Sequence, residues 1–203
     1  MKRIGLFGGT FNPPHLGHLH LATQAMRQAK LDEVIIMPSY MPPHKDAPEL
    51  VSGTTRLTLC GMTFSDTHFR ISDLEIRRGG KSYTVETMRT LRKVYPRDEL
   101  YLIIGSDMLL SFDSWYCADE ILSLCTLLVL SRENELAPDT LREYAVRTLG
   151  LTEGVGFMIL ETTPIVLSST EIRRAIAAGE DVSASLSDEA YEYIKDKGLY
   201  LDD

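Results

Sequence analysis

Apolar and polar residues follow two patterns along this chain. Short unbroken apolar runs predict strands that are buried on both faces, and these occupy residues 4–7, 33–37, 69–76, 100–104, 124–130 and 157–160. Apolar residues at intervals of three and four predict helices. The first helix begins near residues 15–17, and five more span about residues 52–64, 82–95, 138–149, 168–179 and 187–198.

The alternation of strands and helices predicts an α/β fold. Strands without polar interruptions need cover on both faces, so we expect a doubly wound parallel sheet with helices on both faces, in a single domain over residues 1–203. In such a sheet the binding crevice lies at the carboxyl ends of the strands.

Several residues predict where the helices begin and which way they face. Ser52 is expected to cap a helix, whose inward residues are predicted to be Leu57, Cys60, Gly61 and Phe64. Ser168 and Glu171 have the spacing of a capping box. Residues 39–48 hold three prolines and are expected to form a loop, which carries His44 and Lys45.

Composition narrows the class of protein. The 203 residues are 44% hydrophobic and 25% charged, which suits a domain with a substantial core. A net charge of −8 argues against non-specific binding of nucleic acid or of an anionic membrane, but not against a small phosphate ligand. No apolar stretch is long enough for a membrane span or has the form of a signal peptide. Cys60, Cys117 and Cys125 form no CxxC motif and are expected to be reduced, so we expect a cytoplasmic protein.

The first twenty residues carry the clearest chemistry. An apolar run is broken by Gly8, Gly9 and Thr10, and a helix follows two prolines later. A strand, a glycine turn and a helix N-terminus make an anion site, because backbone N–H groups and the helix dipole meet there. His15 and His18 stand three residues apart, on one side of the first helical turn.

Other interpretations of this stretch are weaker. The glycines lack the G-x-G-x-x-G spacing, and no Walker lysine follows them. The two histidines could bind a metal, but no Glu, Asp or Cys completes a ligand set nearby. Alternatively, one histidine caps the helix and the other is exposed. Two histidines beside a Gly-Gly-Thr turn favour phosphate binding.

A second polar run, Leu167 to Arg174, also suits a phosphate. Its three hydroxyls, from Ser168, Ser169 and Thr170, lie at a predicted helix N-terminus, and Arg173 lies one turn further on. By itself this run could equally be a well-capped surface helix with two solvated arginines.

These motifs resemble those of a known family. Residues 9–18, GTFNPPHLGH, resemble the GxFxPxHxGH signature of nucleotidyltransferases with an HxGH motif, and residues 167–174 resemble their ISSTxIR motif. Further matches resemble the bacterial nicotinate mononucleotide adenylyltransferases, and they lie at residues 42–45, 82–87, 105–107, 115, 131–132 and 198–200. Asn12 replaces a common Asp, residues 182–189 lack an expected proline, and the neighbourhood of Trp115 matches only at that tryptophan.

The resemblance implies a Rossmann-like nucleotidyltransferase fold and a reaction of NAD biosynthesis. AMP would pass from ATP to the 5′-phosphate of nicotinate mononucleotide, giving nicotinate adenine dinucleotide and pyrophosphate. A phosphate monoester is already largely a dianion at pH 7, so the reaction needs positioning and positive charge rather than a general base. Mg²⁺ is expected to bind through the ATP phosphates, without a carboxylate cage from the protein.

The resemblance also assigns roles to residues. The expected catalytic residues are His15, His18, Lys45 and Arg173. The expected ATP-binding residues are Gly8, Gly9, Thr10, Phe11, Gly105, Asp107, Ser131, Arg132, Ser168, Ser169 and Thr170. The expected residues for nicotinate mononucleotide are His44, Lys45, Tyr83, Thr84, Trp115 and Tyr116.

Two of these roles have structural alternatives. Asp107 could hydrogen-bond a ribose or cap the helix that begins at Met108. Trp115 could stack on the pyridine ring or belong to the core. Backbone N–H groups near Thr84 would suit the nicotinate carboxylate.

Other functions stay open. Pantetheine-phosphate adenylyltransferase shares the HxGH motif but is usually shorter and is not expected to carry the 82–87 segment. A tRNA synthetase fragment would need a KMSKS-like lysine motif. A nucleotide-binding regulator without turnover would not need both histidines, Lys45 and Arg173. The expected partners are small molecules, with no nucleic acid and no membrane, and the sequence leaves monomer or homo-oligomer undetermined.

Overall fold

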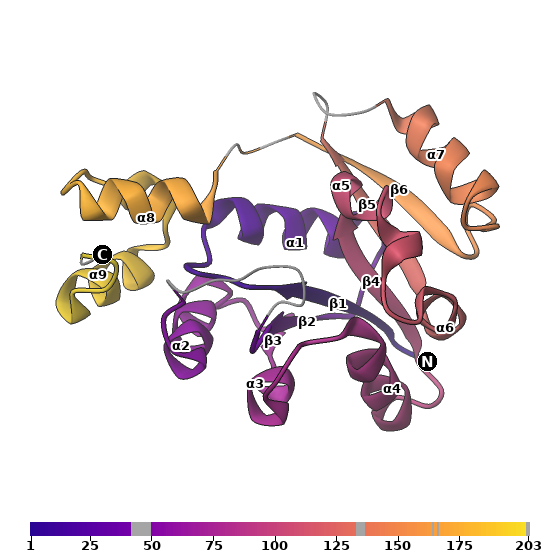
Figure 1. The fold of residues 1–203 in the computed structure, drawn as a ribbon, viewed down its shortest axis with the longest axis horizontal. Coiled ribbons are helices and arrows are strands. Elements are labelled where there is room, and N and C mark those ends of the chain that lie inside the picture. Colours follow the sequence, from indigo (N-terminus) through magenta and orange to yellow (C-terminus); the bar gives the residue numbers. More distant parts are fainter. Residues whose placement is uncertain (42–49, 133–136, 164, 166, 202–203) are drawn as a thin grey trace. The chain divides into compact units, whose positions relative to one another are not determined.

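The computed structural model describes residues 1–41, 50–132, 137–163, 165 and 167–201. In this part of the chain six strands form one sheet, in the order β3-β2-β1-β4-β5-β6 (Figure 1). The strands are β1 (Arg3–Gly9), β2 (Glu33–Pro38), β3 (Phe69–Ile71), β4 (Glu99–Gly105), β5 (Thr126–Arg132) and β6 (Phe157–Thr162).

The strands pair in parallel where their register is described. Phe7 of β1 lies opposite Ile103 of β4, Gly105 of β4 opposite Leu130 of β5, and β5 continues in the same direction along β6. Their apolar runs are buried, as parallel strands covered on both faces require. The predicted α/β fold with a parallel sheet is therefore confirmed.

The chain packs into two compact units. Unit one comprises Met1–Gly8, Leu21–Ile35 and Tyr83–Pro164, and unit two comprises Gly9–His20, Ile36–Ser82 and Ile165–Asp203. Because the chain passes between them several times, they are not consecutive segments. The expectation of a single domain stays a prediction.

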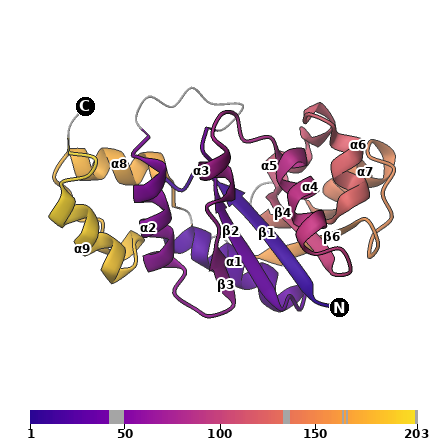
Figure 2. The same cartoon turned by 90° about the horizontal axis from the view of Figure 1, so that it is seen from below.

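Unit one has helices on both faces of its strands. Its own helices are α4 (Thr84–Val94), α5 (Ser106–Leu109), α6 (Ala118–Leu124), α7 (Pro138–Arg147) and the 3-10 helix η1 (Phe112–Ser114). The part of α1 (Leu16–Gln28) from Leu21 onward lies on one face and α4 on the other, as Figures 1 and 2 show. Within this unit α4 packs against α6, and α7 against β6.

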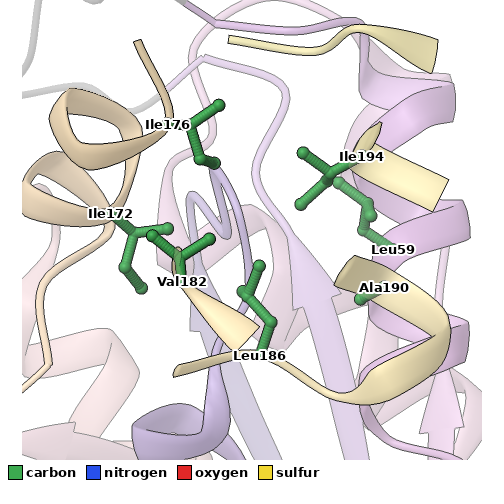
Figure 3. Close-up of a cluster of buried hydrophobic side chains, with 7 residues drawn as sticks. All are labelled: Leu59, Ile172, Ile176, Val182, Leu186, Ala190 and Ile194. Carbon is green, nitrogen blue, oxygen red and sulfur yellow. The ribbon is translucent and has the colours of Figure 1, made fainter. Parts of the chain in front are cut away.

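Unit two is built around a cluster of apolar side chains. It holds the start of α1, helices α2 (Gly53–Thr63), α3 (Leu74–Arg78), α8 (Ser169–Ala177) and α9 (Asp188–Lys197), and the 3-10 helix η2 (Ser183–Ser185). Figure 3 shows the cluster, to which α2, α8, α9 and the connection from α8 to α9 contribute Leu59, Ile172, Ile176, Val182, Leu186, Ala190 and Ile194. These buried residues join α2 to α8 and α9, although more than a hundred residues separate them in the sequence.

The structure corrects several boundaries. The stretch 69–76 is extended only over Phe69–Ile71, and α3 begins at Leu74. Leu124 ends α6, so β5 starts at Thr126 and not at residue 124. The short helices α3 and α6 were not predicted, and α5 was expected only in the alternative in which Asp107 caps a helix at Met108, because four to seven residues give too few turns to establish a helical period.

The buried face of α2 also differs from the prediction. Ser52 does cap this helix, since its Oγ accepts the Thr55 N–H at 3.0 Å. Cys60 and Phe64 are buried as predicted, but Arg56, Leu59 and Thr63 are buried as well, whereas Leu57 is half-buried and Gly61 is exposed.

All three cysteines are free thiols, as the sequence predicts. Burial raises the pKa of the Cys60 thiol well above its usual range, and that of Cys125 to about 12. Both are therefore protonated at neutral pH.

The apolar cluster of unit two predicts a specific loss of stability. Ile194→Ala should lower the free energy of unfolding by about 2–5 kcal/mol, because it removes a buried side chain and leaves a cavity. Urea unfolding measures this change. Glu192→Ala, on the exposed side of the same helix, should change it by no more than about 0.5 kcal/mol. Equal losses for the two variants would contradict the packing.

Candidate active site

The chain turns sharply after β1, where the strand delivers Gly9 and Thr10 to the start of α1. Phe11 has a φ of 51°, a left-handed conformation that a residue with a side chain adopts only where its surroundings hold it. The Phe11 ring is buried and lies edge-on to His18 and to Phe64, with centroids 5.1 and 5.9 Å apart. A Cβ at Gly9 would lie 2.9 Å from this ring, so glycine is needed there.

His15 and His18 cap the N-terminus of α1 by hydrogen bonds to each other's backbone. The Nδ1 atom of His15 accepts the backbone N–H of His18, and the Nδ1 of His18 accepts the backbone N–H of His15, both at 3.3 Å. This is the arrangement of a capping box, in which each side chain accepts the other residue's N–H. The His18 N–H is shared, because it also donates to the His15 carbonyl at 2.9 Å. The rings are stacked, with centroids 3.7 Å apart and planes 29° apart.

This pairing decides which ring nitrogen carries the proton. A neutral imidazole has one N–H donor and one acceptor nitrogen. Since both Nδ1 atoms lie in acceptor positions, the geometry assigns the hydrogen to Nε2 in both neutral rings. The alternative in which one histidine caps the helix and the other is merely exposed is therefore wrong, because both act as caps and His15 is buried. Two Nε2–H donors beside a helix N-terminus suit an anion.

The second motif lies against the backbone that precedes His15. The Ser169 hydroxyl donates to the Pro13 carbonyl at 2.8 Å, and Nη1 of Arg173 donates to the Asn12 carbonyl at 2.9 Å. The two motifs singled out in the sequence thus meet in unit two. Ser169 and Pro13, which share a hydrogen bond, are 156 residues apart in the sequence. Ser168 is the N-cap of α8, but its side chain makes no capping hydrogen bond, so the predicted capping box with Glu171 is wrong.

Asn12 connects the turn to the C-terminal segment. Its Oδ1 accepts the Tyr200 hydroxyl at 3.1 Å and the Val51 N–H at 3.3 Å. Burial raises the pKa of Tyr200 well above its usual range, which keeps the phenol as a donor. A carboxylate at position 12 could accept the same two bonds, so Asn12 supplies the acceptor that the Asp expected from the resemblance would supply.

Sequence reasoning missed Arg56, which lies beside the same turn. Its guanidinium is buried and donates to the carbonyl oxygens of Thr10, Ser39, Tyr40 and Val51. An arginine at helical spacing from Leu59 and Cys60, and so on an apolar face, was the signal that could have identified it.

The predicted adenosine residues follow the carboxyl ends of β4 and β5 in unit one. Gly105 ends β4 and Ser131 and Arg132 end β5, at neighbouring strands of the sheet. Asp107 is exposed and is the second residue of α5, so it is not an N-cap for Met108. Its Oδ1 would lie 2.5 Å from a Cβ at position 105, which shows that the carboxylate folds back over Gly105.

An aromatic group in unit one contains the residues predicted for the pyridine nucleotide. Trp115 is half-buried and stacks on the buried Phe112, with centroids 4.8 Å apart. The rings of Tyr83 and Tyr116 lie 5.0 Å apart, and Tyr83 is the N-cap of α4, directly before Thr84. Tyr116 is exposed.

Two further observations concern charge and metal binding. His44 and Lys45 lie outside the described residues. Among the described residues, no group of three or more His, Cys, Asp or Glu side chains could hold a metal ion. The groups that converge near α1 and α8 are hydrogen-bond donors, which fit phosphate oxygens rather than a cation.

A profile of the cytidylyltransferase-like family matches residues 6–175. The chain belongs to this family. The probable nicotinate-nucleotide adenylyltransferase of Halalkalibacterium halodurans is 39% identical over 202 residues, which cover 98% of this chain and 92% of that protein. The protein of the same name from Synechococcus sp. (strain JA-3-3Ab) is also 39% identical, with coverages of 99% and 96%.

Solved structures agree with the fold. The Plasmodium falciparum nicotinic acid mononucleotide adenylyltransferase complexed with NaAD covers 98% of both chains with a TM-score of 0.80 at 15% identity. That identity is low, so the likeness shows the cytidylyltransferase-like fold alone. No helix in the described ranges is both long and apolar enough to cross a membrane.

Substitution of Gly17, which lies between the two histidines, is expected to lower activity without unfolding the protein. A Cβ there would lie 3.0 Å from Nδ1 of His15 and 3.3 Å from the Ile165 carbonyl oxygen. Gly17→Ala should therefore displace the His15 ring and lower turnover about 10- to 100-fold. Steady-state kinetics and circular dichroism measure the two effects.

Gly61→Ala is the matched control in another helix. Nothing lies within 4 Å of a Cβ at position 61, so this variant should gain up to about 1 kcal/mol of stability and keep its turnover. Full activity in Gly17→Ala would contradict the role of the reciprocal cap.

Proposed function

We propose that this chain is an adenylyltransferase that transfers AMP from ATP to the 5′-phosphate of nicotinate mononucleotide, in NAD biosynthesis. An oxygen of the acceptor phosphate forms a bond to the α-phosphorus of ATP. The bond from that phosphorus to the bridging oxygen breaks, and the electron pair leaves with pyrophosphate. The names of full-length relatives at 39% identity support this reaction.

The reciprocally capped histidine pair is the observation that supports the proposal most strongly. With both Nδ1 atoms placed to accept backbone N–H groups, each ring would act through an Nε2–H donor and not as a base. Because the acceptor phosphate is largely a dianion at pH 7, no base is needed. His15 and His18 would stabilise the charge that develops on the transferred and leaving phosphates.

Arg173 and Lys45 would add positive charge to the same task. Arg173 lies within hydrogen-bond distance of the Asn12 carbonyl, two residues before Pro14 and three before His15. The planar geometry of its guanidinium suits phosphate oxygens. Gly8, Gly9, Thr10, Phe11, Ser168, Ser169 and Thr170 are proposed to contribute mainly backbone N–H groups, since Phe11 is buried and the Ser169 hydroxyl is used by Pro13.

Unit one is proposed to recognise the two nucleosides. Asp107, above Gly105, could accept hydrogen bonds from a ribose, and the ends of β5 at Ser131 and Arg132 would lie along the adenosine. Trp115, supported from below by Phe112, would stack on the pyridine ring. Tyr116, Tyr83 and Thr84 would complete this subsite, with the N-terminus of α4 as the partner of the nicotinate carboxylate. His44, which lies outside the described residues, is also proposed to bind nicotinate mononucleotide.

Adenylyl transfer from ATP generally uses a divalent metal, and we propose Mg²⁺. The described residues fit the phosphates and not a bare cation, so Mg²⁺ would be held by phosphate oxygens and water. When bound, it would neutralise charge on the triphosphate.

Product formation from Mg-ATP with three acceptors in parallel tests the function. We expect rapid formation of the dinucleotide and pyrophosphate with nicotinate mononucleotide. The rate should be lower by about tenfold or more with nicotinamide mononucleotide, which lacks the carboxylate. Phosphopantetheine should be inert. Turnover with phosphopantetheine alone would overturn the acceptor, and silence with all three alongside ATP binding would favour a regulator.

His18→Ala tests the catalytic role of the pair. It removes one Nε2–H donor, and turnover should fall about 100-fold or more, while the apparent affinity for ATP changes less. Single-turnover kinetics with ATP-binding calorimetry separates the two effects. A variant with the turnover of the wild type would refute the assignment of His18.

A further inference from the structure

Arg56 is a charged side chain buried among uncharged backbone groups of the described residues. It lies on α2, is 2% exposed, and is among the largest fully buried side chains of the described chain. Arginine is almost never buried to this degree unless it is paired. Here its partners among the described residues are four backbone carbonyls, which carry no net charge.

The four carbonyls belong to three segments of backbone. Nη1 donates to Thr10 at 2.8 Å and to Ser39 at 2.6 Å. Nη2 donates to Tyr40 and Nε to Val51, both at 3.2 Å. Thr10 follows β1, Ser39 and Tyr40 follow β2, and Val51 precedes α2, so one side chain holds the ends of two neighbouring strands and the approach to a helix.

Each of these segments is also held by a second hydrogen bond to its neighbours. The Ser39 N–H donates to the Gly9 carbonyl, the Tyr40 N–H to Oγ of Ser82, and the Val51 N–H to Oδ1 of Asn12. Arg56 therefore lies at the centre of a network, and its loss would release several backbone groups together.

Thr10 connects this network to the phosphate turn. The peptide bond is planar and trans, so the N–H of Phe11 points opposite to the carbonyl of Thr10. By holding that carbonyl, Arg56 sets the direction of the next N–H in the turn that leads to His15. The buried guanidinium also places a permanent positive charge one hydrogen bond from this backbone; burial lowers the pKa of Arg56, but an arginine stays protonated.

We propose that Arg56 is a positioning residue of the adenylyl transfer. It acts through the Thr10 and Ser39–Tyr40 carbonyls, by holding the phosphate turn and the end of β2 in register, and it contacts no substrate. This inference rests on the proposed function and extends it to a residue outside the two motifs. A buried guanidinium with a merely structural role would affect stability only.

Three variants separate positioning from stability. Arg56→Met removes the charge and all four hydrogen bonds, and Arg56→Lys keeps the charge but has fewer and differently directed donors. Leu59→Ala destabilises the same helix by removing a side chain of the apolar cluster. The turnover number and KM for Mg-ATP, with nicotinate mononucleotide saturating, are measured well below each variant's melting temperature.

We expect turnover to fall about 100-fold in Arg56→Met and about tenfold in Arg56→Lys, with smaller changes in KM. Leu59→Ala should stay within about threefold of the wild type despite its lower melting temperature. A stabilising osmolyte such as trimethylamine N-oxide should raise the melting temperatures of all three but should not restore turnover in the Arg56 variants.

Several outcomes would overturn the proposal. A folded Arg56→Met with turnover within about threefold of the wild type would do so. If Arg56→Met does not fold, Arg56→Lys decides: turnover equal to that of Leu59→Ala, or full recovery with osmolyte, would show a structural role alone. If the wild-type chain forms no product from nicotinate mononucleotide, the proposed function itself fails. That result is distinct from a failure of the Arg56 proposal, because it is seen without any substitution.

Discussion

The hydrogen bonds between His15 and His18 are the constraint on which the site depends. At the start of α1 the two imidazoles accept each other's backbone N–H groups, and the His18 N–H is shared with the His15 carbonyl. The same two bonds orient both rings, stack them and leave the hydrogen on Nε2. Helix capping and the proposed anion recognition therefore use opposite edges of the same side chains, which ties the fold of this turn to the chemistry proposed for it.

The backbone before the pair is held from several directions within unit two. Arg56 holds Thr10, Arg173 and Tyr200 hold Asn12, and Ser169 holds Pro13. Phe11, in a left-handed conformation, packs edge-on against the His18 ring. Segments from α2, α8 and the C-terminus thus converge on four consecutive residues, and the apolar cluster that joins α2 to α8 and α9 keeps these segments in place.

The strands were predictable because parallel strands are buried on both faces, which leaves continuous apolar runs such as those of β2 and β4. The histidines were predictable from their place after a strand and a glycine turn. Their reciprocal bonds were not, since three-residue spacing fits a metal pair, a single cap or a capping box equally well. Arg56 was missed because burial of a guanidinium depends on carbonyls from positions 10, 39, 40 and 51, which only the tertiary structure brings together. The capping box expected at Ser168 failed for a related reason, in that α8 uses the next hydroxyl, Ser169, for a tertiary contact.

The tautomeric state of the two imidazoles tests this account most directly. In protein labelled with ¹⁵N at histidine, two-bond ¹H–¹⁵N correlations at neutral pH distinguish a protonated Nε2 from a protonated Nδ1, and single His→Gln variants assign the signals. The account predicts that His15 and His18 are both neutral with the hydrogen on Nε2, and that replacing either one alters the signals of the other. A hydrogen on Nδ1 of either ring, as the second tautomer or as an imidazolium, would contradict it, because that nitrogen could then no longer accept the backbone N–H.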